Sequence, residues 1–164
     1  MLKIRDIINK LKSIADAHPN INYFGVGQIS DLTDDVMEYP YLWVDTTPSH
    51  TVLYNEDSDY KAVEYEFTIR IGDKVNDQQG YSDIRGIGTT NEVDIISDTF
   101  SILLDVINTI SEDSLLLFED VSLVDDISVE PFFNEDIGDV SGNQATLRFR
   151  VINDKVCITP ISAP

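Results

Sequence analysis

Two segments carry apolar residues at the three- and four-residue spacing of a helix that buries one side. The first runs from Leu2 to about Ala17 and ends at His18-Pro19. The second runs from about Asn91 to Ser111, and its polar residues form only a narrow stripe: Asp94, Ser97, Asp98, Ser101, Asp105 and Asn108. Because nearly every other position of the second helix is apolar, one sheet surface covers only part of it, and the remainder must meet the first helix or a neighbouring subunit.

Alternation of apolar and polar positions predicts two long strands. The clearer one runs from Tyr60 to Ile71, and the other from Ala145 to Val151. If the two strands are adjacent and antiparallel, arginines of the second strand lie opposite glutamates of the first. The residues concerned are Arg148, Arg150, Glu64 and Glu66.

Three shorter segments are also expected to be strands. Ile21 to Ile29 contains Gly25 and Gly27, where a bulge or a close backbone approach is expected. Tyr41 to Val44 is a continuous apolar run, which is typical of a strand buried on both faces. Thr51 to Tyr54 is expected to pair, as a hairpin, with the strand that begins at Tyr60.

Composition indicates one soluble domain and restricts its partners. The chain has 164 residues, of which 42% are hydrophobic, and it carries 30 acidic against 11 basic residues, a net charge of −19. Such a charge argues against a protein that grips nucleic acid through its phosphates or that is attracted to an anionic membrane. The single Cys157 cannot form an internal disulfide, and no signal peptide or membrane-spanning segment is expected.

The charges are unevenly distributed along the chain. Four basic residues lie in the first twelve positions: Lys3, Arg5, Lys10 and Lys12. Between Arg85 and Arg148 there are no basic residues and fourteen acidic ones. This bias indicates either a solvated surface that confers solubility or a face that repels an anion.

Candidate catalytic and binding groups are few, and we expect neither an enzyme nor a cofactor. Neither His18 nor His50 has a nucleophile at a recognisable spacing, and Cys157 is expected to be a small buried residue. The glycines at 86 and 88 lack the Lys-Ser/Thr of a phosphate-binding loop. Acidic positions at calcium-loop spacing exist, but a tyrosine stands where that loop needs glycine: Asn55, Asp57, Asp59, Tyr60 and Glu66.

Two polar stretches are long for loops of a small domain. Lys74 to Thr90 is spaced by glycines, and Phe132 to Gly142 is the second. Loops of this length are either functional or disordered. We therefore expect both to be arms that contact neighbouring subunits.

The order of segments resembles a family of small structural proteins of tailed bacteriophages, the tail-terminator, tail-completion and neck-ring subunits. The segments that carry the resemblance are INYFGVGQISDL, YPYLWVD, YKAVEYEFTIRIGDKV, SDTFSILLDVI and the terminal DKVCITP. With the N-terminal amphipathic helix included, the resemblance extends over nearly the whole chain. The resemblance implies a tail-terminator-like α/β (α+β) fold over residues 1–164, with a twisted mixed or mostly antiparallel sheet and two main helices on one side.

The resemblance also implies a function and partners. The chain would form a homomeric ring, six- or twelve-fold, at the neck or tail of the virion, after assembly in the host cytoplasm. Its partners would be other copies and phage neck, portal or tail proteins, with DNA passing without specific binding and no membrane. The alternative is a cytoplasmic acidic module that binds a small ligand or calcium. Candidate interface residues are Lys3, Arg5, Gln79, Tyr81, Ile84, Arg85, Ile87, Ile95, Ile102, Val106, Phe132 and Phe133.

Overall fold

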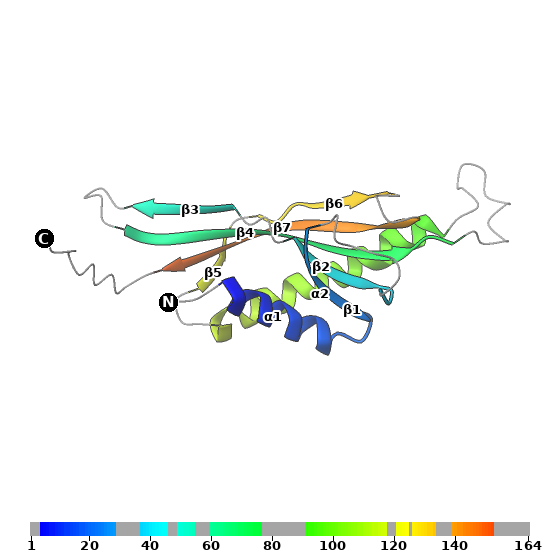
Figure 1. The fold of residues 1–164 in the computed structure, drawn as a ribbon, viewed down its shortest axis with the longest axis horizontal. Coiled ribbons are helices and arrows are strands. Elements are labelled where there is room, and N and C mark those ends of the chain that lie inside the picture. The colour runs from blue at the N-terminus through cyan, green and yellow to red at the C-terminus, as the bar shows by residue number, and fades with distance from the viewer. Residues whose placement is uncertain are drawn as a thin grey trace, which may run out of the picture.

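The computed structural model describes residues 4–28, 37–45, 49–54, 60–76, 91–117, 121–124, 126–133 and 139–152. Two helices in this part of the chain, α1 (Ile4–Ala17) and α2 (Glu92–Leu117), lie on one face of a seven-stranded sheet (Figure 1). The strands are β1 (Tyr23–Gly27), β2 (Tyr41–Asp45), β3 (Ser49–Tyr54), β4 (Tyr60–Lys74), β5 (Val121–Val124), β6 (Val129–Phe132) and β7 (Val140–Ile152). The expected helices and long strands are confirmed, whereas β5 and β6 were not expected.

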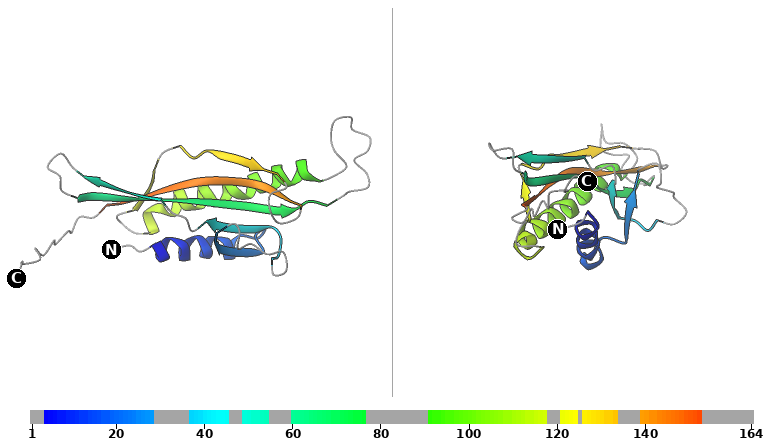
Figure 2. Two further views of the ribbon diagram at one scale, coloured as in Figure 1. Left: turned by 45° about the horizontal axis from the view of Figure 1, so that its top comes forward. Right: turned by 60° about the vertical axis from the view of Figure 1, so that its left-hand side comes forward.

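The long antiparallel pair of β4 and β7 is the centre of the sheet. The strand order is β1-β2-β4-β7-β5, with β3 also paired to β4 and β6 also paired to β7. Among the strand pairs that the structure describes, only β1–β2 is parallel. The right-hand view in Figure 2 shows both helices beneath the same sheet face. The predicted α+β fold, with a mostly antiparallel sheet and two helices on one side, is therefore confirmed.

The main core lies between the helices and the sheet. Alternate residues of β4 and β7 point into it, and Ile69 and Leu147 are completely buried there. From α2, Leu103 and Val106 are also completely buried. The period-two pattern of the strands and the helical pattern of α2 thus meet in one apolar layer, which is the main stabilising feature of the fold.

A second, smaller cluster lies on the opposite face of the sheet, where no described helix covers it. It contains Tyr41 and Trp43 of β2, Phe132 of β6 and Val140 of β7. Leu42 and Val44 of β2 point the other way, into the main core. The apolar run over Tyr41–Val44 is therefore buried on both faces, as predicted.

Glycines make room for these aromatic rings. A Cβ on Gly25 would lie 2.2 Å from ring carbons of Trp43, and one on Gly72 would lie 2.6 Å from the phenol of Tyr41. Gly25 pairs with Trp43, and Tyr41 pairs with Gly72, across neighbouring strands. The close approach expected at Gly25 is confirmed.

The two long polar stretches are shorter than the sequence suggested. β4 extends to Lys74, and β7 begins at Val140, so the ends of both stretches belong to the central strand pair. Because β7 pairs with β4 as far as Lys74, the polar residues at these ends gain regular hydrogen bonds. Residues 77–90 and 134–138 lie outside the described part, so their role as arms remains a prediction.

Candidate subunit interface

The surface of α2 is divided into three sides. The side facing the sheet is buried and includes Ile95, Leu103 and Val106. A polar side carries the acidic residues and borders the end of α1, where Ser101 and Asp105 line a hollow with Pro19 and Asn20. The third side is apolar and exposed. We call its three residues, Val93, Phe100 and Leu104, the α2 stripe.

The α2 stripe follows from helix geometry. Positions 93, 100 and 104 are separated by seven and four residues, which places them within about 40° of one another around the helix. Val93 is 60% exposed, Phe100 42% and Leu104 38%. Since Ile102 and the polar side are turned toward α1, the stripe is on the flank of α2 that points to the edge of the sheet formed by β5 and β6.

Another exposed aromatic side chain lies at the same edge. Phe133 follows β6 directly and is 54% exposed. Phe132 pairs with Gly142, and the adjacent Ser141 donates a hydrogen bond of 2.7 Å to the carboxylate of Glu92 at the start of α2. Phe133 therefore follows a strand at the same edge of the sheet toward which the α2 stripe points.

The structure buries four of the residues predicted for the interface. Ile102 and Val106 pack in the main core, Phe132 packs in the second cluster and Ile95 is buried in the first turn of α2, with no more than 6% of any of them exposed. They cannot reach a partner, so their assignment was wrong. The apolar pattern does not show which flank of α2 is covered by α1, so it did not separate the exposed α2 stripe from the buried residues of the same helix.

Two predicted interface residues are exposed, namely Arg5 on α1 and Phe133 after β6. The six others lie outside the described residues: Lys3, Gln79, Tyr81, Ile84, Arg85 and Ile87. The ends of the 77–90 segment are held together, because Asn91 accepts a hydrogen bond of 2.7 Å from the main-chain N–H of Asn76.

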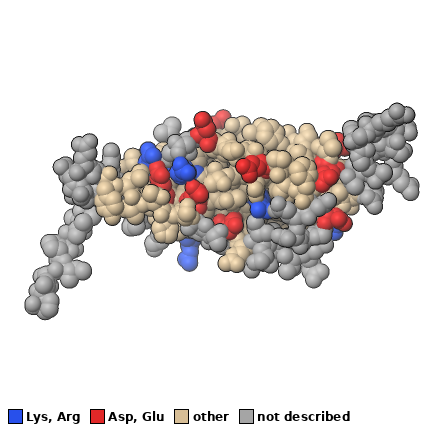
Figure 3. Space-filling model, turned by 90° about the horizontal axis from the view of Figure 1, so that it is seen from above, with Lys and Arg blue, Asp and Glu red and all other residues tan. Residues whose placement is uncertain are grey.

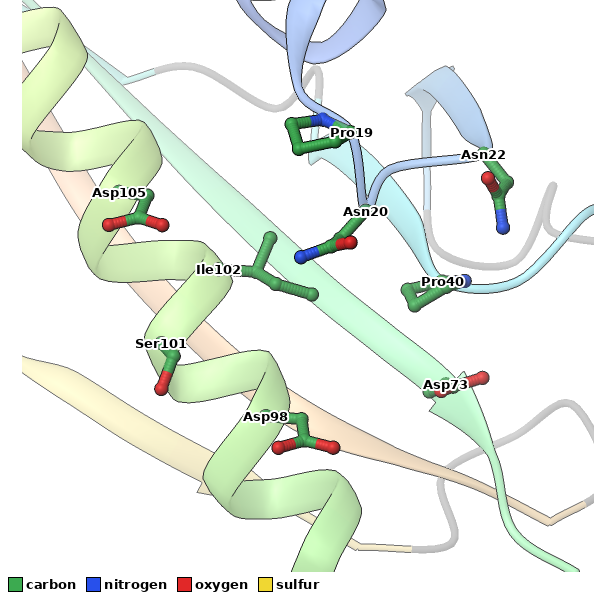
Figure 4. A pocket seen from close by; sticks show the side chains of 9 residues that line it. All are labelled: Pro19, Asn20, Asn22, Pro40, Asp73, Asp98, Ser101, Ile102 and Asp105. Carbon is green, nitrogen blue, oxygen red and sulfur yellow. The ribbon is translucent and has the colours of Figure 1, made fainter.

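A hollow of about 460 Å³ separates α2 from the turn after α1 (Figure 4). It is lined by Pro19, Asn20, Asn22, Pro40, Asp73, Asp98, Ser101, Ile102 and Asp105. Burial raises the pKa of the Asp73 carboxyl, the hydrogen bond from the Lys74 N–H opposes this, and the nearby charge of Asp98 adds to the increase. In the described part of the chain, no three His, Cys, Asp or Glu side chains are grouped closely enough to hold a metal ion.

The other residues considered as catalytic or binding candidates either make contacts that stabilise the fold or lie outside the described residues. His18 ends α1, as expected: its N–H donates to the Ala15 carbonyl at 3.1 Å, and its ring lies 3.7 Å from the Asp105 carboxylate. Glu66, the last position of the calcium-like pattern, is paired with Arg148 at 3.2 Å. The positions at 55–59, the glycines at 86 and 88, and Cys157 lie outside the described residues.

No protein-family model matches the chain, and no curated protein matches it. Neither described helix combines the length and apolar character that crossing a bilayer requires.

Proposed function

We propose that this protein is a non-enzymatic structural subunit of a tailed bacteriophage, which assembles head to tail into a homomeric ring at the neck or tail. The observation that carries the proposal is the exposed α2 stripe, Val93, Phe100 and Leu104. The resemblance of the ordered sequence segments to tail-terminator and neck-ring subunits supplies the phage context. A contact between two different faces of a subunit can repeat from copy to copy. It produces a closed ring when the rotation that relates neighbouring copies divides a full turn evenly.

The energetic case rests on half-exposed apolar side chains. Complete burial of a Phe or Leu contributes about 1.5–3 kcal/mol, so covering the exposed part of each contributes about 1 kcal/mol. Three such residues are aligned on one helix, and Phe133 follows β6 at the same edge of the sheet, so these exposed apolar side chains are grouped rather than scattered. A neighbouring subunit at the β5–β6 edge would cover all four.

The net charge of −19 supports a role in DNA passage without DNA binding. If acidic residues line the channel of the ring, they repel phosphates, and DNA passes without being held. The proposal includes both a terminator on the tail tube and a connector ring between portal and tail. Cryo-electron microscopy of the phage particle would place the ring and count its copies.

Native mass spectrometry and negative-stain microscopy of the purified protein, over a range of concentrations, test assembly. We expect a closed ring, and we expect Phe100→Ser with Leu104→Ser to abolish it. Val26→Ser is the matched control and should leave the ring intact, because Val26 is 37% exposed, close to the 38% of Leu104, but lies on β1 at the opposite end of the strand order. A monomer at every concentration, both alone and mixed with phage tail tubes, would refute the proposal.

A further inference from the structure

Two strands at one end of the sheet have an edge that no described strand covers. β3 pairs only with β4, and β5 pairs only with β7. Their sequences, SHTVLY and VSLV, contain no charged residue and no proline. An edge strand without such protection is a template for pairing with another chain.

The neighbouring edge strand provides the contrast. β6 lies on the same side of β7 as β5, and its four residues include Glu130 and Pro131. A charge and a residue without an N–H are the features that protect natural sheet edges. Protection is therefore present on β6 and missing from β3 and β5, which are the two outer strands of the four-strand order β3-β4-β7-β5.

The directions of the strands fit a contact between copies. β3 is antiparallel to β4, β4 to β7, and β7 to β5, so β3 and β5 run in opposite directions. If a second copy, in the same orientation, is placed beyond β5, its β3 lies antiparallel to β5. Such a contact joins two different edges, as a head-to-tail ring requires.

The side chains of the two edges also match face by face. One cross-strand row on the helix side consists of four valines: Val52, Val63, Val151 and Val121. The next row, on the other face, begins with Thr51 and ends with Ser122. Pairing β5 with the next copy's β3 would place valine beside valine and hydroxyl beside hydroxyl, the kind of cross-strand pairs that stabilise sheets.

We propose that β5 of each copy pairs with β3 of the next, so that the sheets of the ring join into one continuous antiparallel sheet. This inference rests on the proposed ring. The α2 stripe lies on the β5 side of the molecule, so a copy docked on β5 would also approach Phe100 and Leu104. Strand pairing and apolar burial would then form one contact surface.

Cysteine pairing tests the contact directly, in full-length protein with Cys157→Ser. Thr51→Cys and Ser122→Cys lie three strand spacings apart in one chain, about 14 Å, which exceeds the roughly 7 Å limit for a disulfide. When a sheet closes into a ring, paired strands can be offset along their length. An offset of two residues keeps each side chain on the same face of the sheet. Ser49→Cys and Leu53→Cys, each with Ser122→Cys, therefore cover the neighbouring registers.

On oxidation, one of the three pairs is expected to give a ladder of covalent oligomers that ends at the mass of the ring, while each single-cysteine variant gives dimers at most. As an independent test, Thr51→Lys on the β3 edge should abolish the ring, whereas Asn9→Lys on the exposed side of α1 should leave it intact. Rings with no covalent ladder for any pair, and unaffected by Thr51→Lys, would overturn strand pairing and leave the ring standing. Absence of rings would overturn both proposals.

Discussion

The side-chain amide of Asn143, on β7, donates a hydrogen bond of 2.7 Å to the main-chain carbonyl of Ile96 in α2. The same amide contacts the hydroxyl of Thr99 at 2.9 Å, and Asn143 is only 3% exposed. A buried amide in an apolar core is stable only when its hydrogen bonds are made. The pair therefore fixes where α2 sits along the sheet, and with it the position of the α2 stripe.

Asn143→Ala should lower the free energy of unfolding by about 1–3 kcal/mol, because it removes both hydrogen bonds and leaves a small cavity between β7 and α2. Urea unfolding followed by circular dichroism measures the change. Asn108→Ala, on the exposed side of α2, is the control and should change the free energy of unfolding by less than about 0.5 kcal/mol. Equal effects of the two variants would contradict the role assigned to Asn143.

The two predicted ion pairs across β4 and β7 form, but they should contribute unequally. Arg150 donates to Glu64 from both Nε and a terminal nitrogen, at 2.8 and 2.6 Å, and the Glu64 side chain is 13% exposed. Arg148 lies 3.2 Å from Glu66, and both of those side chains are about 40% exposed. In Figure 3, blue and red side chains meet in a group toward the end of the sheet where β3 lies.

Double-mutant cycles with Glu→Gln and Arg→Met substitutions should give a coupling free energy of about 1 kcal/mol for Glu64–Arg150. The more exposed Glu66–Arg148 pair should give about 0.3 kcal/mol, because solvent screens it. A larger coupling for the exposed pair would show that burial does not set the difference.

Gly25→Ala should disturb Trp43. The new Cβ would fall 2.2 Å from the indole ring, so the ring must move out of a site where it is 5% exposed. We expect a loss of about 1–3 kcal/mol of stability. Since Trp43 is the single tryptophan, its fluorescence should shift to longer wavelength. Val26→Ala, at the adjacent and exposed position, should leave the emission unchanged.

Asp73→Asn should stabilise the protein at neutral pH. A raised pKa means that the folded chain binds the Asp73 proton more tightly than the unfolded chain does, so the charged carboxylate opposes folding at neutral pH. That cost disappears as the pH falls through the folded pKa toward 3.8. The advantage of the variant, measured by urea unfolding, should therefore vanish below pH 3.8, and an advantage that persists there would contradict the role assigned to the Asp73 charge.

Most of the fold could be predicted from sequence because its strong periodicities coincide with burial. Three patterns each indicate which sides of an element are buried. They are the alternation in β4 and β7, the helical spacing in α1 and α2, and the unbroken apolar run of β2. β5 and β6 were missed because they have four residues each and pair with a longer strand, so their structure depends on β7 rather than on their own pattern.

The candidate interface could be predicted only in part. The excess of apolar residues on α2 indicated that more than one surface must cover the helix, and among the side chains that the structure describes the strongly exposed apolar ones of α2 are those of the α2 stripe. Which apolar residues remain exposed depends on the side on which α1 packs, and this is a tertiary property. A helical projection of α2 places Leu103 on the side opposite the polar residues, and this identifies it as buried. It does not show which of the two flanks between these sides is covered by α1.

Because of the second cluster, one half of the sheet has side chains packed on both of its faces, and the other half is packed mainly on one face. Around Gly72 and Gly142, side chains pack on both faces, whereas around Val63 and Val151 they pack mainly on the helix side. Amide deuterium uptake should therefore be slowest beside the aromatic rings and fastest at the β3 end. The strands proposed to join neighbouring copies thus lie in the half that opens most readily, so edge strands can adjust their register while the rest of the domain stays closed.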